Sequence, residues 1–506
     1  MKDEYVRGLL LAFGVGFAVR LIPELLSFPH PIGWDTVFYA YRISEGSVFG
    51  FWDSAFTTWL PYGVTIGLGG VTGWDPFLVL KIVAPMLYGG CAAGMYFVGW
   101  KKLRWSARES LLTSFLFCFQ LAALAISWQF YRNMFGVMFL LFALPFIKED
   151  LRWREAAWLS MLSVLVVWSH ELAAVSLFFI VFMLFIHGVV EERRVPFLLL
   201  AALIPAVAIF LASNLGVLHP MVSLGRNIMW LGDSNYAKVG GVYFLTDYLR
   251  VSTPYEHYTS YFDLFFHVFS LFLLLYALIM PLIPTGYFKD KVLLYWTGIL
   301  SVGAFNCIIT PFCALMLWNR WMLMLVFPLT FFAAHGVWKT LKSHQTTGSR
   351  IQISKKVALC LVSLLVVAGI LFMALPPHGR HEALPWGNTC PYIPSSMQRS
   401  SIPLSDTSDL TEAYQWLNTR MDNQSCLMVH EAFEDWTLLY LKEEYAAAVF
   451  HRNLEEATSI SLQHHYHPLY LLWWNPEIEW YHLPIPQNWI PIFHSNRITI
   501  YRYSET

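Results

Sequence analysis

The stretch Pro29-His30-Pro31-Ile32-Gly33-Trp34-Asp35-Thr36-Val37-Phe38-Tyr39 separates a long apolar run from a new amphipathic segment. It places one carboxylate, that of Asp35, directly after a Gly-Trp corner. The apolar run before it, residues 7–27, has the length of roughly 20 residues that a helix needs to cross a membrane. The stretch therefore predicts that the chain leaves a membrane here and presents Asp35 at the surface, either as a helix cap or as a working acid.

The composition of the whole chain agrees with a membrane location. Of its 506 residues, 57% are hydrophobic and only 13% are charged, and the mean hydropathy is +0.49. Soluble domains carry about a quarter charged residues, so we expect a polytopic α-helical membrane protein. The net charge of -1 gives no sign of a nucleic-acid partner, and the seven cysteines form no CxxC pair that would suggest a zinc or redox site.

Apolar runs along the chain predict about eleven transmembrane helices. They lie near residues 7–27, 76–99, 109–128, 134–148, 156–170, 172–190, 196–213, 263–285, 292–311, 320–338 and 357–375. The run from Ala156 to Gly188 is too long for one span. We divide it at His170-Glu171, because a polar pair costs less at the membrane interface than in the bilayer centre.

The distribution of Lys and Arg predicts the orientation. With the N-terminus inside, the predicted inside segments carry 18 of these residues, whereas the outer loops before residue 376 carry six. Inside loops are enriched in Lys and Arg, so we expect a multi-pass protein of the cell membrane with a cytoplasmic N-terminus. An odd number of spans then places the C-terminal region outside the cytoplasm.

Three regions follow from this topology. Residues 1–375 form the membrane region with two long outer loops, 28–75 and 214–262, residues 376–404 form a Pro-rich linker, and residues 405–506 form a small extracytoplasmic α/β domain. In that domain alternation and capping residues predict strands and helices. The strands are expected at 426–430, 446–450, 470–474, 490–493 and 497–502, and the helices at 408–419, 435–441 and 453–463.

Polar residues near the predicted helix ends gather on the outer side. They are Asp35, Arg132-Asn133, His170-Glu171, Arg226 and Trp318-Asn319-Arg320. Structural alternatives exist: Asp35 caps a helix, Arg132 and Arg320 reach to lipid headgroups, and His170-Glu171 form a hydrogen-bonded pair. Headgroup contacts alone give no reason for an acid, a histidine and arginines to meet at one mouth, so together they predict a polar outer cavity.

The chain resembles the GT-C superfamily of integral-membrane glycosyltransferases. The resemblance rests on Arg20-Leu21-Ile22-Pro23 at the end of the first helix, on Pro31-Ile32-Gly33-Trp34-Asp35 opening the first outer loop, and on the architecture as a whole. It implies that Asp35 is the catalytic residue, as a general base or as a ligand of a divalent metal. It also implies a polyprenyl-phosphate-linked sugar donor, with Arg132, Arg226 and Arg320 as candidates for its phosphate.

Two departures from the superfamily's oligosaccharyltransferases favour a transferase of single sugars. The string Trp473-Trp474-Asn475-Pro476-Glu477 lacks the Asp of their WWDYG motif, and no outer loop contains DxD. One carboxylate with nearby arginines suffices for inverting transfer without metal. The expected partners are the polyprenyl-phosphate sugar donor, membrane lipids, and a protein, lipid or glycan acceptor, with substrate-binding roles for Asn133, His170 and Glu171 beside the arginines. A transporter or flippase of a lipid-linked saccharide is the alternative, although this chain has no repeated halves.

Overall fold

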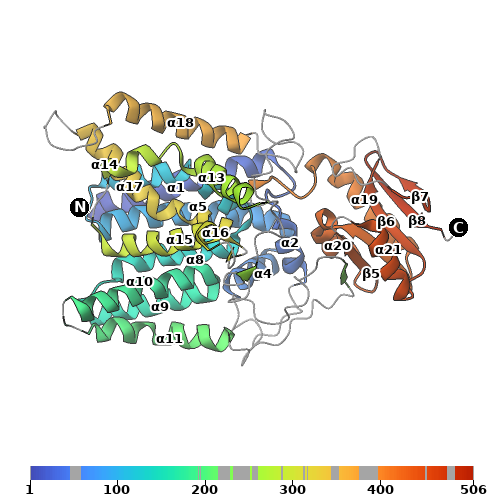
Figure 1. The fold of residues 1–506 in the computed structure, drawn as a ribbon, viewed down its shortest axis with the longest axis horizontal. Helices are drawn as coiled ribbons and strands as arrows, with labels where there is room; N and C mark the ends of the chain where they lie inside the picture. Colours follow the sequence, from blue (N-terminus) through green and yellow to red (C-terminus); the bar gives the residue numbers. More distant parts are fainter. Residues whose placement is uncertain are drawn as a thin grey trace.

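The computed structural model describes most of the chain. The described residues are 2–45, 59–191, 193, 195–214, 228–231, 251–252, 260–286, 289–310, 314–315, 317–342, 353–374, 397–450, 453–475 and 485–504. Figure 1 shows a bundle of long helices that contains the N-terminus and, beyond one end of the bundle, a smaller domain built around a β-sheet that contains the C-terminus.

Each of the eleven predicted spans is helical. The helices of the bundle are α1 (Lys2–Leu26), α5 (Pro76–Phe97) with the π-helix η1 (Val98–Lys102), α6 (Ala107–Cys118), α7 (Leu121–Gln129), α8 (Tyr131–Ala143) with η2 (Leu144–Phe146), α9 (Trp153–Ser169), α10 (Glu171–Val190), α11 (Phe197–Asn214), α13 (Tyr261–Tyr276), η4 (Met280–Leu282), α14 (Ile283–Gly286), α15 (Lys291–Ile309), α16 (Trp318–Met324), α17 (Val326–Lys342) and α18 (Lys355–Ala374).

Fewer than eleven of the described helices are long and apolar enough to cross a membrane by themselves. Among the described residues, six helices are long and apolar enough to cross a membrane, and counting each of two bent pairs as one span gives eight. In the bent pairs, α6 and α7 meet at 64°, and α13 and the segment 280–286 meet at 71°. Extended backbone at Gln120 interrupts the first pair, and Pro281 follows the break in the second. The chain is thus a multi-pass membrane protein, while the predicted count of about eleven is not confirmed.

Small residues allow the first helix to lie close to its neighbour. A side chain at Gly16 would come within 2.8 Å of the Ala92 side chain, and one at Gly89 would come within 2.8 Å of the Phe13 carbonyl oxygen. Helix pairs in membranes gain most of their association energy from such close packing. The contact between α1 and α5 therefore fixes where the chain leaves the bundle and enters the loop that carries Asp35.

The C-terminal domain contains the predicted strands and helices. The strands are β4 (Cys426–His430), β5 (Ala446–Phe450), β6 (Leu469–Trp474), β7 (Trp489–His494) and β8 (Ile498–Tyr503), and the helices are α19 (Thr407–Arg420), α20 (Glu434–Tyr440) and α21 (Leu454–Gln463). A strand from the second outer loop, β1 (Ile228–Leu231), pairs in parallel with β5 and completes the sheet order β1-β5-β4-β6-β8-β7. Every residue of β4, β5 and β6 is buried, as expected when elements cover both faces of a mostly parallel sheet.

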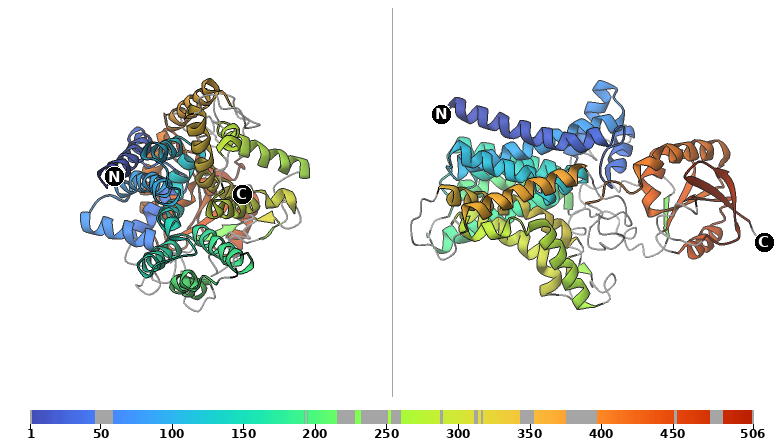
Figure 2. Two further views of the ribbon diagram at one scale, coloured as in Figure 1. Left: turned by 90° about the vertical axis from the view of Figure 1, so that its left-hand side faces the viewer. Right: turned by 90° about the horizontal axis from the view of Figure 1, so that it is seen from above.

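Two short helices of the first outer loop, α2 (Thr36–Ser44) and α4 (Leu60–Thr72), lie at the end of the bundle that faces the sheet domain (Figures 1 and 2). The helix α2 packs against α20 of the sheet domain. Of the second outer loop the structure describes β1, the strand β2 (Val251–Ser252) that pairs with β3 (Ala314–Leu315), and the start of α13. The arrangement brings the start of α2, and with it Asp35, to the junction between bundle and sheet domain.

Candidate active site

The backbone before Asp35 is held in an unusual conformation. Gly33 has a φ of +122°, and a side chain at this position would approach the Trp128 carbonyl oxygen to 2.3 Å. Its amide donates a hydrogen bond to the Arg399 carbonyl oxygen at 2.7 Å, and the Trp34 amide donates one to Oε1 of Gln129, also at 2.7 Å. Only glycine adopts this φ without strain and allows so close an approach. The Gly-Trp corner is therefore fixed between the end of α7 and the segment before the sheet domain.

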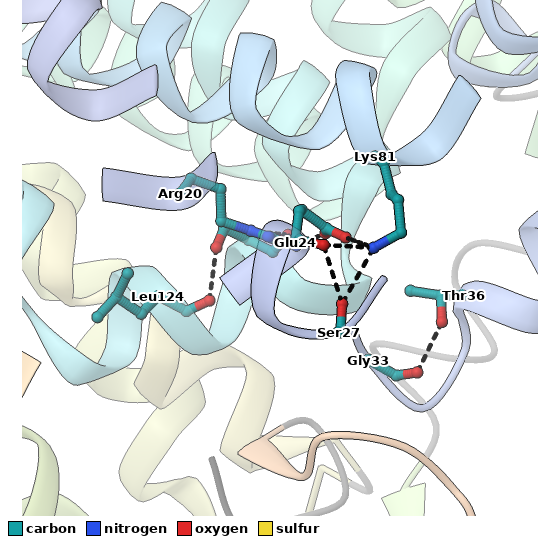
Figure 3. Close-up of polar contacts among 8 residues, drawn as sticks. Arg20, Glu24, Ser27, Gly33, Thr36, Lys81 and Leu124 are labelled. Atoms are coloured by element: carbon teal, nitrogen blue, oxygen red, sulfur yellow. Dashed lines mark hydrogen bonds and ion pairs between the residues drawn. The ribbon is translucent and has the colours of Figure 1, made fainter. Parts of the chain in front are cut away.

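Asp35 occupies the N-cap position of α2, but its side chain does not cap the helix. The hydroxyl of Thr36 instead donates to the Gly33 carbonyl oxygen at 2.7 Å (Figure 3). An N-cap carboxylate usually accepts a hydrogen bond from one of the first backbone amides of the helix. The structure therefore does not support helix capping as the reason for an acid at this position.

Two of the predicted site elements form an ion pair. Nη2 of Arg132, at the start of α8, lies 2.5 Å from Oε1 of Glu171, at the start of α10. Nε2 of His170 lies 3.7 Å from the other oxygen of the same carboxylate. His170 and Glu171 are buried, and Arg132 is half-buried. The structural alternative offered by the sequence was a hydrogen bond between His170 and Glu171, and the contact of 3.7 Å between Nε2 and the carboxylate is longer than a hydrogen bond.

Arg320 reaches the same region from α16. Its guanidinium lies 4.8 Å from the centre of the Phe130 ring, and its charge acts on both Asp35 and His170. Asn133, next to Arg132, is 2% exposed, and its Oδ1 has no hydrogen-bond partner in the described part of the chain. Arg226 lies outside the described residues. The structure thus brings Asp35, Arg132, His170, Glu171 and Arg320 together at one end of the bundle.

Aromatic residues of the first outer loop line this region. The rings of Tyr39 and Tyr131 lie 5.0 Å apart, and those of Tyr39 and Tyr62 lie 5.7 Å apart. The guanidinium of Arg42 lies 5.3 Å from the centre of the Tyr62 ring. Such contacts orient a guanidinium while leaving some of its N–H groups for other partners. The sequence did not single out Arg42 or these tyrosines as members of the site.

The sheet domain contributes two acids that the sequence did not single out, Glu434 and Asp435 at the start of α20. The next residue, Trp436, is buried against His30 and Phe77, with ring centres 5.8 and 6.3 Å apart. His30 also shares a hydrogen bond of 2.9 Å with the hydroxyl of Thr407. This docking places the two carboxylates close enough to Asp35 for its charge to act on both.

The three carboxylates have unusual electrostatics. None of them receives a hydrogen bond or an ion pair from the described residues. Burial raises the pKa of Asp35, and the positive charge of Arg320 opposes this shift. Burial, followed by the charge of Asp35, raises the pKa of Asp435 well above its usual range. Like charges in one partly buried region do not all ionise readily, so Asp435 holds its proton more strongly than an ordinary aspartate.

A second charged group lies deeper, inside the bundle. The carboxylate of Glu24 forms ion pairs with two cations, Nη2 of Arg20 at 2.7 Å and Nζ of Lys81 at 3.1 Å (Figure 3). The guanidinium of Arg20 also donates to the Ser127 carbonyl oxygen, and Lys81 donates to the hydroxyl of Ser27. All three charged residues are at most 5% exposed. The network joins α1, α5 and the end of α7, which also holds the Gly-Trp corner.

Comparison with solved structures finds glycosyltransferases. The arabinofuranosyltransferase AftD from Mycobacteria matches with a TM-score of 0.52 at 11% identity, over 99% of this chain and 40% of that one. The chain of the present protein thus spans two fifths of the length of this neighbour. The present chain therefore shares the fold of the matched part of this arabinofuranosyltransferase.

The archaeal oligosaccharyltransferase AglB from Archaeoglobus fulgidus, in complex with an inhibitory peptide and a dolichol-phosphate, matches at 11% identity with a TM-score of 0.45, over 92% of this chain and 69% of that one. Neither the models of known families nor the curated proteins contain a match to the sequence. The fold shared with the arabinofuranosyltransferase agrees with the resemblance seen in the sequence. At this identity it establishes the fold alone, so the roles of Asp35 and the arginines stay predictions.

The resemblance seen in the sequence left room for a divalent metal beside Asp35, but the described residues do not fit one. No group of three His, Cys, Asp or Glu side chains in the described ranges is arranged to hold a metal ion. We therefore derive no step through a metal. The Trp473-Trp474 string is fully buried in β6, and Nε1 of Trp474 donates to Asp406. These tryptophans form part of the domain core, which agrees with their difference from the oligosaccharyltransferase motif.

Proposed function

We propose that the protein transfers a single sugar from a polyprenyl-phosphate donor to a hydroxyl acceptor at the outer end of its helices. The observation that carries this proposal is the state of Asp35. It begins α2 without capping it, it receives no hydrogen bond from the described residues, and it lies within the electrostatic reach of Arg320. A carboxylate that contributes nothing to its own helix is available for a substrate. The bias of Lys and Arg toward the other side of the membrane supports the outer face.

In the proposed reaction Asp35 acts as the general base. Its carboxylate accepts the proton of the acceptor hydroxyl while the hydroxyl oxygen forms a bond to the anomeric carbon of the donor sugar. The bond between that carbon and the phosphate oxygen breaks on the opposite face, and its electron pair leaves with the polyprenyl phosphate. The configuration at the anomeric carbon is therefore inverted. A base with a raised pKa is also a better proton acceptor once it is ionised.

The departing phosphate gains negative charge, and the arginines are placed to stabilise it. Guanidinium groups bind phosphate oxygens through two parallel N–H donors. We assign this role first to Arg320, whose plane is supported by the Phe130 ring, and second to Arg132, which shares its charge with Glu171. Arg226 is a further candidate on its position in the sequence, while Asn133 and His170 border the same region.

We assign the acceptor to the side formed by the sheet domain. Glu434 and Asp435 approach Asp35 from α20, opposite in charge to the arginines. Carboxyl groups accept hydrogen bonds from sugar hydroxyls, and a protonated carboxyl also donates one. A negative group on the acceptor would be repelled here. The proposal therefore favours a neutral acceptor with several hydroxyl groups, such as a glycan.

The test uses the full chain in lipid nanodiscs, incubated with defined polyprenyl-phosphate sugars and neutral oligosaccharide acceptors. The expected result is release of polyprenyl phosphate together with an acceptor that is heavier by one sugar. Asp35→Asn should lower transfer by about 10²–10⁴-fold, because it removes the base and little volume. Donor binding should be retained. Wild-type turnover by Asp35→Asn would exclude Asp35 as base, and movement of the lipid-linked sugar across vesicles without any transfer would favour the transporter.

A further inference from the structure

We infer that Gln129 is a positioning residue that keeps Asp35 at a fixed position relative to Arg132 and Arg320. This inference rests on the proposed function. The buried Gln129, 2% exposed, is the last residue of α7, and its Oε1 accepts the hydrogen bond from the amide of Trp34 at 2.7 Å. Trp34 directly precedes Asp35. One side-chain oxygen of the bundle thus holds the backbone from which the candidate base extends.

The close approach of two backbones supports this assignment. Gly33 lies so near the Trp128 carbonyl oxygen that a side chain there would approach it to 2.3 Å. The loop therefore rests on the final turn of α7, and Gln129 bonds to it at the next residue. Since Gly33 also donates to Arg399, the corner is held from both sides.

The end of α7 is itself anchored. The guanidinium of Arg20 donates to the Ser127 carbonyl oxygen at 3.3 and 3.2 Å from its Nε and Nη2. The ring of Trp128 stacks on Phe372 of α18 with the centres 4.3 Å apart and the planes inclined by 7°. Residues 127–129 consequently form a platform that is connected to α1 and α18 as well as to the loop.

The same segment carries the other half of the site. Phe130, the next residue, supports Arg320, and Arg132 pairs with Glu171. Residues 129–132 therefore position both the base and the phosphate-binding guanidiniums. Loss of the Gln129 bond should release the base while leaving the arginines in place. A displacement of about 1 Å between reacting groups costs as much as roughly 100-fold in rate.

The experiment compares Gln129→Met and Gln129→Glu in the full chain in nanodiscs. Methionine keeps the volume and removes the acceptor, whereas glutamate keeps an acceptor oxygen and adds charge. For Gln129→Met we expect kcat to fall by roughly 10- to 100-fold with a donor KM within about 3-fold of wild type. We also expect faster amide exchange in the peptide containing residues 29–39. Gln129→Glu should recover kcat at high pH, with the acidic limb of its pH profile moved upward because a nearby negative charge raises the pKa of Asp35.

Gln120→Met is the matched control. Gln120 begins the same helix, is fully buried, and has no hydrogen-bond partner for either amide atom among the described residues. It should leave kcat and exchange in residues 29–39 at wild-type values. An equal loss in Gln120→Met, or wild-type kcat and exchange in Gln129→Met, would overturn the positioning role. If Asp35→Asn stays active, the proposed function fails instead, and the exchange measurement still decides whether Gln129 holds the loop.

Discussion

Arg132 and Glu171 join α8 to α10 through an ion pair of 2.5 Å. Because Glu171 is 7% exposed, the loss of Arg132 would remove a cation from beside a buried carboxylate. We therefore expect Arg132→Met to destabilise the protein more than the double variant Arg132→Met/Glu171→Gln, in which no charge is left unpaired. The coupling between the two sites should be about 1–3 kcal/mol in a double-mutant cycle. Thermal unfolding in detergent measures it, and additive effects of the two substitutions would contradict the prediction.

Arg320 should act on donor binding more than on stability. Arg320→Ala removes a group whose charged hydrogen bonds to phosphate contribute about 1.5–3 kcal/mol, so the donor KM should rise by roughly 10- to 100-fold. Arg320→Lys should recover only part of this loss, because lysine lacks the planar fork that binds phosphate and stacks on Phe130. Steady-state kinetics with varied donor gives both values.

A matched control for Arg320 lies in the sheet domain. Arg420, at the end of α19, places its guanidinium 5.8 Å from the centre of the Trp416 ring. Arg420→Ala removes the same kind of cation-ring contact from a different part of the molecule and should leave the donor KM unchanged. A donor KM that is equally raised in both variants would point to a general effect of lost cation-ring packing rather than to phosphate binding.

The pH profile should report the environment of Asp35. Burial raises its pKa and Arg320 opposes that shift. A base works only when ionised, so activity should be present above this raised pKa and be lost as the pH falls through it. Removing the charge in Arg320→Gln should move the acidic limb to still higher pH. The measurement is kcat/KM for the acceptor against pH. An acidic limb at the same pH in wild type and Arg320→Gln would contradict the electrostatic effect of Arg320 on Asp35.

Sequence reasoning succeeded where the relevant interactions are local. Apolar runs predicted the helices, and the patterns at Cys426–His430 and Ala446–Phe450 predicted two strands, because each pattern reflects burial of the segment that carries it. The bends at residues 119–120 and 277–279 were missed, since both halves of each pair are equally apolar. The gathering of Asp35, Arg132, His170-Glu171 and Arg320 could be expected from helix ends on one side.

The contacts that sequence reasoning missed are all between distant segments. Asp435 approaches Asp35 because Trp436 docks on His30, and Ile228–Leu231 joins the sheet by pairing with Ala447–Phe450. Nothing in either segment alone specifies the partner. The same holds for Gln129, because its hydrogen bond with the Trp34 amide forms only when the fold brings these two distant residues together. The acids at 431, 434 and 435 were a visible charge cluster, but a cluster at a helix start is also explained by the helix dipole.

Asp435 should hold its proton more strongly than an ordinary aspartate. Burial and the charge of Asp35 raise its pKa well above the usual range. The folded protein then holds a proton that the unfolded chain releases, so this group lowers stability as the pH rises above its unfolded pKa. Asp435→Asn resembles the protonated form and should increase the unfolding temperature more at pH 8 than at pH 5, while raising the acceptor KM if the side chain binds the acceptor. Thermal unfolding at both pH values tests this. A larger increase in unfolding temperature at pH 5 than at pH 8 would contradict the raised pKa of Asp435.

Glu24 is the anion on which the deepest charged network depends. It is 1% exposed and pairs with both Arg20 and Lys81, so its removal leaves two cations buried without a carboxylate. Removing one partner of a buried pair costs about 3–5 kcal/mol, and we expect Glu24→Gln to lower the unfolding temperature strongly and to loosen the end of α7 through Arg20.

Glu155→Gln is the control, because its pair with Lys148 is partly exposed and should contribute about 0–1 kcal/mol. Adding Lys81→Met to Glu24→Gln should recover part of the stability, because it removes one of the stranded charges. If Glu24→Gln and Glu155→Gln unfold at the same temperature, the buried network does not stabilise the bundle.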